Sequence, residues 1–237
     1  MIRSPPAPTA PRFTAYVAAM AGQTGKTSAA PWVPADAGVD ELKQAAEQCR
    51  GCELWEPATQ VVFSAGNPQA RMMLVGEQPG DVEDQRGIPF VGPAGTLLQR
   101  ALGDAGIDRS EVYVTNAVKH FRFKPMGKRR IHQTPEARHI TACRPWLDAE
   151  VADVRPQLIV VLGATAGKAL LGSSFRVTQD RGAVIERETA VGSQRYLATI
   201  HPSAILRMDT AERDAGYDGL VADLRLAADA ISQPAPD

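Results

Sequence analysis

The stretch Arg71-Met72-Met73-Leu74-Val75, followed by Gly76-Glu77-Gln78-Pro79-Gly80-Asp81, decides the fold class of this chain. It joins a short apolar run to a polar, turn-forming loop. A run of this length and composition is typical of a buried strand. Three further runs have the same character and also end at a small, polar or turn-forming residue. They are Val112 to Thr115, Leu158 to Leu162 and Tyr196 to Ile200.

Helical patterns alternate with these four runs. Strand–helix alternation is typical of a parallel sheet covered by helices on both faces. We therefore expect a three-layer α/β/α sandwich around a central four-stranded parallel sheet. The expected helices are Asp40 to Gln48, Ala94 to Ala105, Pro135 to Ala152, Ala164 to Leu171 and Tyr217 to Ala230.

Polar residues follow each of the expected strands. In open parallel sheets, ligands bind beyond the carboxyl ends of the strands. The residues at those ends are Gly76 to Asp81, then Asn116, then Gly163, then His201-Pro202-Ser203. The sequence therefore predicts a site where these polar loops converge on one edge of the sheet.

Length and composition indicate one ordinary globular domain. The chain has 237 residues, of which 44% are hydrophobic and 22% charged. Residues 1–35 are rich in Pro, Ala, Thr and Ser, and we expect them to be a disordered N-terminal extension. We expect the first 19 residues to be either an added segment or the product of a misplaced start codon. Residues 36–232 form the expected domain and 233–237 a tail. No run approaches the roughly 18 apolar residues of a membrane helix, and no secretory signal is evident, so we expect a cytoplasmic protein.

Charge is distributed unevenly along the chain, although the net charge is only −1. Residues 122–130 contain five cations and no carboxylate, whereas residues 77–84 contain four carboxylates and no cation. At the end of the basic segment, Lys128-Arg129-Arg130-Ile131-His132 places three consecutive cations before a histidine, with one residue between them. Three adjacent cations can hold a nucleic-acid backbone. In isolation, such a run is more often a solvated loop.

The three cysteines, Cys49, Cys52 and Cys143, point to a metal centre. A Cys-x-x-Cys pair in a cytoplasmic protein indicates metal or redox use rather than a structural disulfide. His120, 23 positions before Cys143, is the candidate fourth ligand. Three thiolates and one imidazole suit zinc or an iron–sulfur cluster. The alternative is that the thiols are merely buried small side chains.

Taken together, these segments resemble the uracil-DNA glycosylase superfamily from about Asp40 to Ala230. The resemblance is closest to the iron–sulfur branch that includes the family 4 enzymes, and within it to the UdgX type. Five segments carry it. Gly76 to Asp81 resembles the first catalytic motif, with Gln78 where family 4 members carry a small residue, and His201 to Ser203 resembles the second catalytic motif. Pro89 to Gly95 resembles the loop whose aromatic ring stacks on the extruded base, and Val114 to Asn116 resembles the strand end that reads uracil. Lys128 to His132 resembles the insertion that marks UdgX proteins.

The resemblance implies a 4Fe-4S cluster with a structural role, away from the base pocket. Its implied ligands are Cys49, Cys52, Cys143 and His120. Family 4 enzymes use four cysteines, and here His120 stands where a cysteine would follow Lys119.

The resemblance also implies how uracil is recognised. Asn116 would contact the base, because its amide offers both a donor and an acceptor, and Gln78 is also placed among the uracil contacts. Phe90 would stack on the flipped ring, and His201 would donate to the uracil oxygen that gains charge as the N-glycosidic bond breaks. The alternatives are a core aromatic for Phe90 and a helix cap or turn residue for Asn116.

In UdgX proteins the resemblance implies that the histidine of the Lys-Arg-Arg-Ile-His loop, here His132, attacks the anomeric carbon and stays bonded to it. Glu77 would accept the imidazole proton or hold its tautomer. Gln78 would occupy the space near the hydrolytic water, and Asp81 would position or activate water. Lys128, Arg129, Arg130 and Ser203 would contact DNA, with Arg130 weighted most. His139 is expected on an exposed helix face without a role.

Three functions are therefore compared. The first is a monomeric glycosylase that acts on uracil-containing DNA, with single strands favoured, and ends bonded to the abasic sugar through His132. The second is a conventional multiple-turnover hydrolytic enzyme of family 4 type. The third is a DNA-binding or iron–sulfur redox module without glycosylase activity.

Overall fold

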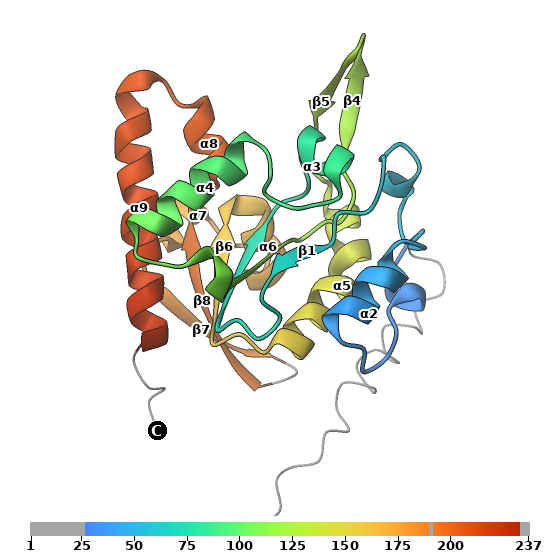
Figure 1. The fold of residues 1–237 in the computed structure, drawn as a ribbon, viewed down its shortest axis with the longest axis horizontal. Helices are drawn as coiled ribbons and strands as arrows, with labels where there is room; N and C mark the ends of the chain where they lie inside the picture. The colour runs from blue at the N-terminus through green and yellow to red at the C-terminus, as the bar shows by residue number, and fades with distance from the viewer. Residues whose placement is uncertain (1–26, 190–191, 233–237) are drawn as a thin grey trace, which may run out of the picture.

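A six-stranded sheet forms the centre of the protein in a computed structural model, which describes residues 27–189 and 192–232. Helices cover both faces of the sheet (Figure 1). The strand order is β1-β3-β2-β6-β8-β7, and β4 and β5 form a separate two-stranded sheet. The strands are β1 Ser64–Gly66, β2 Met72–Gly76, β3 Val112–Asn116, β4 Phe123–Met126, β5 Arg129–His132, β6 Leu158–Leu162, β7 Val184–Thr189 and β8 Gly192–Thr199.

The predicted three-layer α/β/α fold class is confirmed, with a correction to the sheet. The four central strands β3, β2, β6 and β8 pair in parallel, as expected. Two antiparallel edge strands, β1 and β7, extend the sheet to six. The sequence did not reveal them because β1 has only three residues and β7 is largely exposed and polar, so neither forms an apolar run.

Alternate residues of the central strands pack against different helical layers. Met72 and Leu74 face the cluster that contains Leu98, whereas Met73 and Val75 face the cluster that contains Leu147. The pleat sends successive side chains to opposite faces, so a strand buried on both faces is apolar throughout. The helices are α2 Val39–Ala46, α3 Asp81–Arg86, α4 Pro93–Asp104, α5 Ala137–Val154, α6 Gly163–Leu171, α7 Val177–Asp180, α8 Pro202–Arg207 and α9 Thr210–Ser232, with short turns η1 Ala30–Trp32, η2 Glu53–Trp55 and η3 Arg109–Glu111.

The expected N-terminal disorder is wrong for residues 28–35. Ala29 and Val33 are buried in the same apolar cluster as the cysteines, and the Ala29 N–H donates to the Ala142 carbonyl at 2.7 Å. Contacts with α5 therefore order a segment whose composition alone predicts no core. The expectations for residues 1–26 and 233–237 lie outside the described residues. No helix within 27–189 and 192–232 is long and apolar enough to cross a membrane.

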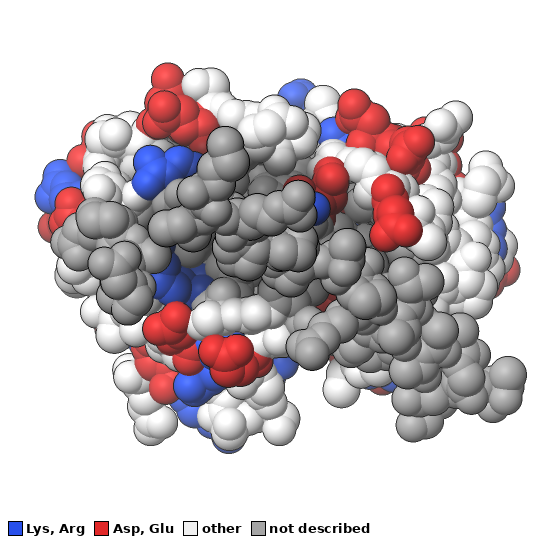
Figure 2. All heavy atoms as spheres, turned by 90° about the horizontal axis from the view of Figure 1, so that it is seen from below, with Lys and Arg blue, Asp and Glu red and all other residues white. Residues whose placement is uncertain are grey.

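The basic segment forms a β-hairpin of β4 and β5 that projects from the edge of the protein (Figure 1). Phe123 pairs with His132, and Met126 pairs with Arg129. The opposite side of the molecule, seen in Figure 2, shows carboxylates and cations interspersed over its described residues. The hairpin therefore carries the exposed cations Lys124, Lys128 and Arg129 away from the body of the fold.

Candidate functional site

The carboxyl ends of the parallel strands bring Asn116 and Phe90 together at Gly76. Gly76, the last residue of β2, pairs with Asn116, the last residue of β3. A Cβ atom at Gly76 would lie 2.4 Å from Asn116 Oδ1 and 2.7 Å from Phe90 Cζ. Side chains cannot approach that closely, so only glycine fits there. Two of the four expected uracil contacts, Asn116 and Phe90, thus meet at the strand edge where the sequence predicts a site.

Phe90 has a strained backbone, which is a recurrent feature of functional loops. Its φ of +57° lies in the left-handed region that non-glycine residues rarely adopt. Gly95 allows this turn, because a Cβ there would lie 1.8 Å from the Phe90 carbonyl oxygen. The buried carboxylate of Glu83 accepts the Gly92 N–H at 2.8 Å. The Phe90 ring lies nearly parallel to the His201 ring, at 27° and with centroids 6.2 Å apart.

His201 presents a neutral imidazole with a defined tautomer. The Ser203 N–H donates to His201 Nδ1 at 3.1 Å, and the Ser203 hydroxyl lies 2.8 Å from the same nitrogen. Nδ1 therefore carries the lone pair and Nε2 the proton. Burial lowers the pKa of His201 to about 4, so the ring is uncharged at neutral pH. His201 can act as a hydrogen-bond donor through Nε2–H, and Ser203 orients it.

Glu77 and His132 contact each other, although the two residues are 55 positions apart. His132 Nε2 lies 3.2 Å from Glu77 Oε1, and the Thr165 hydroxyl donates to Glu77 Oε2. Burial pushes the pKa of Glu77 up, but the hydrogen bonds from His132 and Thr165 outweigh it, so its pKa is lowered. His132 is half-exposed, so a large molecule can reach its imidazole. The arrangement is a histidine oriented by an acid and open to a ligand.

The Gln78 side chain forms hydrogen bonds with the backbone beside both strands of the hairpin, at the end nearest the body of the fold. Its side-chain Nε2 donates to the carbonyls of Arg122 and Gln133, each at 3.2 Å, and its Oε1 accepts the Arg122 N–H at 3.1 Å. Arg122 precedes β4 and Gln133 follows β5. We expected Gln78 to contact uracil and to act near the hydrolytic water. Its amide is instead engaged with the backbone that carries His132.

Arg130 is paired with carboxylates rather than presented to solvent. Its Nε lies 2.5 Å from Asp81 Oδ1, and its Nη1 lies 2.5 Å from Asp84 Oδ2 and 3.0 Å from Thr59 Oγ1. Asp84 is completely buried and also accepts the Thr59 N–H. The guanidinium expected to bind phosphate most strongly therefore anchors the hairpin, and Asp81 is engaged in the same ion pairs. The acidic and basic segments of the sequence meet here.

Lys128 and Arg129 remain available to a ligand. Both side chains are exposed near the tip of the hairpin. Neither forms a hydrogen bond or ion pair with any residue that the structure describes. They are the members of the basic run that suit the predicted contact with phosphate.

A buried ion pair supports the strand end that carries Asn116. The Lys119 ammonium donates to Glu150, to Thr115 Oγ1 and to the Asn116 carbonyl, the last at 3.0 Å. Glu150 also accepts the Tyr113 hydroxyl at 2.8 Å. Buried charges are tolerated when they are paired and hydrogen-bonded in this way. The network fixes the backbone from which the Asn116 amide projects.

The three cysteines lie in an apolar cluster that also contains Ala29, Leu42 and Trp146. Cys49, Cys52 and Cys143 are free thiols buried in that cluster. The Trp146 Nε1–H donates to Cys49 Sγ and the Lys119 N–H to Cys143 Sγ, each at 3.3 Å. His120 is also buried and directly follows Lys119. Within the described residues, no three His, Cys, Asp or Glu side chains are placed to share a single metal ion. The donor set nevertheless suits an iron–sulfur cluster, whose ligands receive N–H bonds and are spread over several irons.

His139 is buried, which corrects the expectation of an exposed position. Its Nδ1 accepts the Glu136 N–H at 3.0 Å, and its Nε2 lies 2.9 Å from Glu53 Oε1. The ring thereby joins the start of α5 to the segment that follows Cys52. Helical spacing alone does not reveal this, because the covering segment is distant in sequence.

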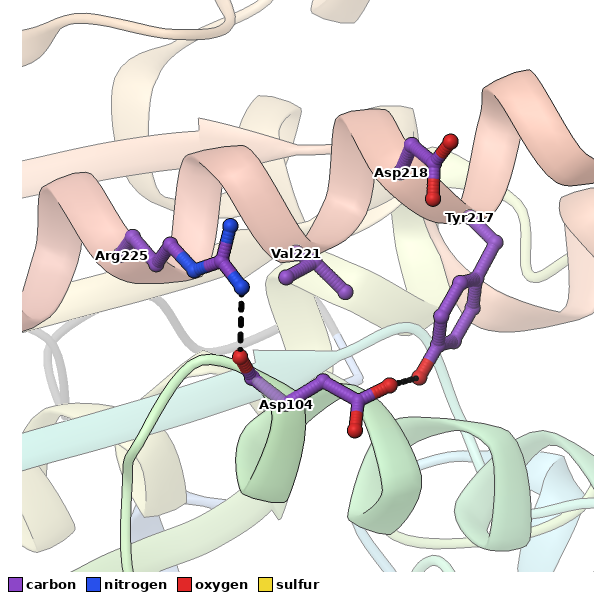
Figure 3. Close-up of a pocket in the computed structure, with 5 residues that line it drawn as sticks. All are labelled: Asp104, Tyr217, Asp218, Val221 and Arg225. Carbon is purple, nitrogen blue, oxygen red and sulfur yellow. Dashed lines mark hydrogen bonds between the residues drawn. The ribbon is translucent and has the colours of Figure 1, made fainter.

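A cavity of about 310 Å³ lies outside the candidate site, between α4 and α9 (Figure 3). Asp104, Tyr217 and Arg225 line it together with Asp218 and Val221. Tyr217 donates its hydroxyl to the Asp104 carboxylate at 2.5 Å, and Arg225 donates to the Asp104 carbonyl at 2.8 Å. Its polar groups are largely satisfied by one another, and none of them belongs to the predicted site.

Sequence reasoning missed several residues that shape the site. Thr165 holds Glu77, Asp84 and Thr59 hold Arg130, and Lys119 supports Asn116. The opposite charge of segments 77–84 and 122–130 was a signal for the Arg130 contacts. No comparable pattern marks Thr165 or Thr59.

Comparisons with known proteins identify relatives of this chain. Residues 63–225 match the family model of the uracil DNA glycosylase superfamily. The chain is 36% identical over 173 residues to the type-4 uracil-DNA glycosylase of Sulfurisphaera tokodaii, which covers 71% of this chain and 76% of the relative. It is 37% identical over 167 residues to the type-4 enzyme of Thermotoga maritima, a match that covers 70% of this chain and 82% of the relative. It is 33% identical over 172 residues to the type-4 enzyme of Archaeoglobus fulgidus, a match that covers 71% of this chain and 83% of the relative. The chain therefore belongs to the uracil DNA glycosylase superfamily.

Proposed function

We propose that this protein removes uracil from DNA and that His132 then bonds to the abasic sugar. The contact between His132 Nε2 and Glu77 Oε1, at 3.2 Å, carries the proposal, because it joins an exposed nucleophile to an acceptor for its proton. Family membership and relatives named type-4 uracil-DNA glycosylases support the first step. The match of Lys128 to His132 to the UdgX insertion supports the second.

Uracil recognition is assigned to the residues that meet at Gly76. A glycosylase reads the edge of a base that has been turned out of the stack. The Asn116 amide, held by its strand end, offers a donor and an acceptor to that edge. The Phe90 ring supplies the stacking surface. His201 donates from Nε2 to the uracil oxygen that becomes negative.

The proposed making and breaking of bonds is balanced without any added reactant. The C1′–N1 bond breaks, and its electron pair leaves with uracil as an anion stabilised by the hydrogen bond from His201. The Nε2 proton of His132 passes to Glu77, and the freed electron pair forms a bond from Nε2 to C1′. The product is a neutral glycosyl imidazole and a protonated Glu77. The lowered pKa of Glu77 favours return of this proton to solvent.

The hairpin contacts support the proposed placement of His132 at the sugar. Gln78 fastens the base of the hairpin and Arg130 its side, which limits the positions that the imidazole can take. Lys128 and Arg129 are proposed to bind phosphates beside the uracil nucleotide. Ordered presentation of a reacting group is a major source of catalytic rate.

A 4Fe-4S cluster is proposed at Cys49, Cys52, Cys143 and His120. The three buried thiols and the N–H groups that donate to two of them support it. When bound, the cluster would supply a cross-link between the Cys49–Cys52 segment and α5. No step of base removal is assigned to it.

A conventional hydrolytic glycosylase is the second candidate. The 33–37% identity to type-4 enzymes favours it. In that case Glu77 would orient a water toward C1′, and His132 would only contact the DNA.

A denaturing gel separates these functions. The protein is incubated with a uracil-containing single-stranded oligonucleotide and heated in SDS. A stable, slowly migrating protein–DNA band is expected. His132→Ser should abolish this band, whereas Thr134→Ala, an exposed neighbour whose side chain has no role in the account, should keep it. Free abasic DNA without the band would refute the covalent step, and intact uracil DNA would refute glycosylase activity.

A further inference from the structure

The two faces of the hairpin differ in what they contact. In an antiparallel pair, directly opposed residues share a face, and successive pairs alternate between faces. The pairs Phe123–His132 and Pro125–Arg130 therefore lie on one face. That inner face is engaged with the site, since His132 contacts Glu77 and Arg130 contacts Asp81 and Asp84.

The remaining pairs make up the outer face, which consists of Lys124, Met126, Arg129 and Ile131. All four side chains are exposed. Met126 is 59% exposed and Ile131 37%, and both lie on this one face. Lys124 and Arg129 have no hydrogen-bond or ion-pair partner in the part of the chain that the structure describes. The outer face thus presents two apolar side chains and two free cations side by side.

We propose that the outer face binds the single-stranded DNA that flanks the uracil nucleotide. Lys124 and Arg129 would contact phosphates, while Met126 and Ile131 would cover the faces of bases left unstacked by the flipped nucleotide. This inference rests on the proposed function, because the inner face must then bring His132 to a sugar of the same strand.

The composition of the surface favours nucleic acid over a protein partner. Phosphates and base faces alternate along a single strand, and proteins bind them by combining cations with apolar or aromatic side chains. Apolar side chains such as Met and Ile also insert beside unstacked base steps. Residues 122–130 contain no carboxylate, so nothing in this segment repels a phosphate backbone. Ile131 directly precedes His132 in β5, so the outer face lies one residue from the proposed nucleophile.

The test separates the apolar from the ionic contribution. Affinity of the full-length protein for a labelled, uracil-free single-stranded oligonucleotide is measured by fluorescence anisotropy over a range of salt concentrations. Met126→Ser and Ile131→Ser should each weaken binding about five- to tenfold without changing its salt dependence. Lys124→Ser should reduce the slope of log affinity against log salt by about 0.7, the value for one phosphate contact on a single strand.

Leu226→Ser is the matched control, because Leu226 is 44% exposed on α9, away from the hairpin. It should bind DNA as the unmodified protein does. The inference is overturned if Met126→Ser and Ile131→Ser match this control, or if they alter the oligomeric state and leave DNA affinity unchanged. Release of uracil by the unmodified protein is scored separately on the denaturing gel. Its absence would refute the proposed function, whereas unaltered DNA affinity in the variants refutes only the outer-face contact.

Discussion

Replacing Arg130 by methionine should loosen the hairpin and destabilise the protein, because it leaves a buried carboxylate without its cation. Asp84 is completely buried, and Arg130 is about one-fifth exposed. Breaking a fully buried ion pair costs about 3–5 kcal/mol. The Thr59 N–H still donates to Asp84 at 3.1 Å, and water can reach part of the pair, so we expect about 2–3 kcal/mol. The methionine keeps much of the apolar length of the side chain.

A double-mutant cycle with Asp84→Asn isolates this interaction. The free energy of unfolding is measured by urea titration for Arg130→Met, Asp84→Asn and the double variant. Asparagine removes the buried charge, so the double variant should be more stable than the sum of the single effects predicts, by about 1–2 kcal/mol. Lys128→Met, an unpaired cation of the same hairpin, should change stability by less than about 0.5 kcal/mol. A coupling energy near zero would refute the view that Arg130 anchors the hairpin.

Three further predictions concern the strand edge. Gly76→Ala should reduce the single-turnover rate of uracil release about 100-fold, because the added Cβ would displace Asn116 and Phe90. Gly103→Ala is the control, because a Cβ at Gly103 meets nothing within 4 Å. Equal rates for the two variants would contradict the placement of Asn116 and Phe90 at the active strand edge. Glu77→Gln should slow adduct formation in rapid-quench experiments by about 10²–10⁴-fold, as expected for loss of a proton acceptor, and an unchanged rate would remove Glu77 from the reaction. His201, with a pKa of about 4, should stay neutral down to about pH 5.5 in an NMR titration, where a midpoint near 6.5 would contradict its burial. Because an unfolded histidine binds its proton first, the contribution of His201 to stability should be complete above about pH 6.5 and decline as the pH falls towards 4.

The four central strands could be predicted from the sequence because burial on both faces makes them apolar throughout. Leu158–Leu162 was predicted with its observed bounds, and the predicted start of β3 was also correct. The edge strands could not be predicted in this way. Val184–Thr189 carries charged residues and is held in place by its pairing with β8.

The hairpin shows where sequence reasoning stops. Its residues have no alternating apolar pattern, and its shape depends on contacts with Gln78, Asp81 and Asp84, which lie about 50 positions away. A basic run indicates affinity for phosphate but does not show which cation is already paired. Arg130 was therefore given a role that Lys128 and Arg129 fit better. The residues at the strand ends were more predictable, because parallel strands must deliver their carboxyl ends to one edge.

Mass spectrometry of the protein after reaction with uracil-containing DNA shows directly whether His132 becomes bonded to the sugar. The complex is treated with nuclease and trypsin, which releases the peptide spanning residues 131–138, in which His132 is the only histidine. If His132 attacks the sugar, this peptide carries an abasic deoxyribose fragment on His132, in a yield that matches the uracil released. An unmodified peptide recovered together with released uracil would contradict it.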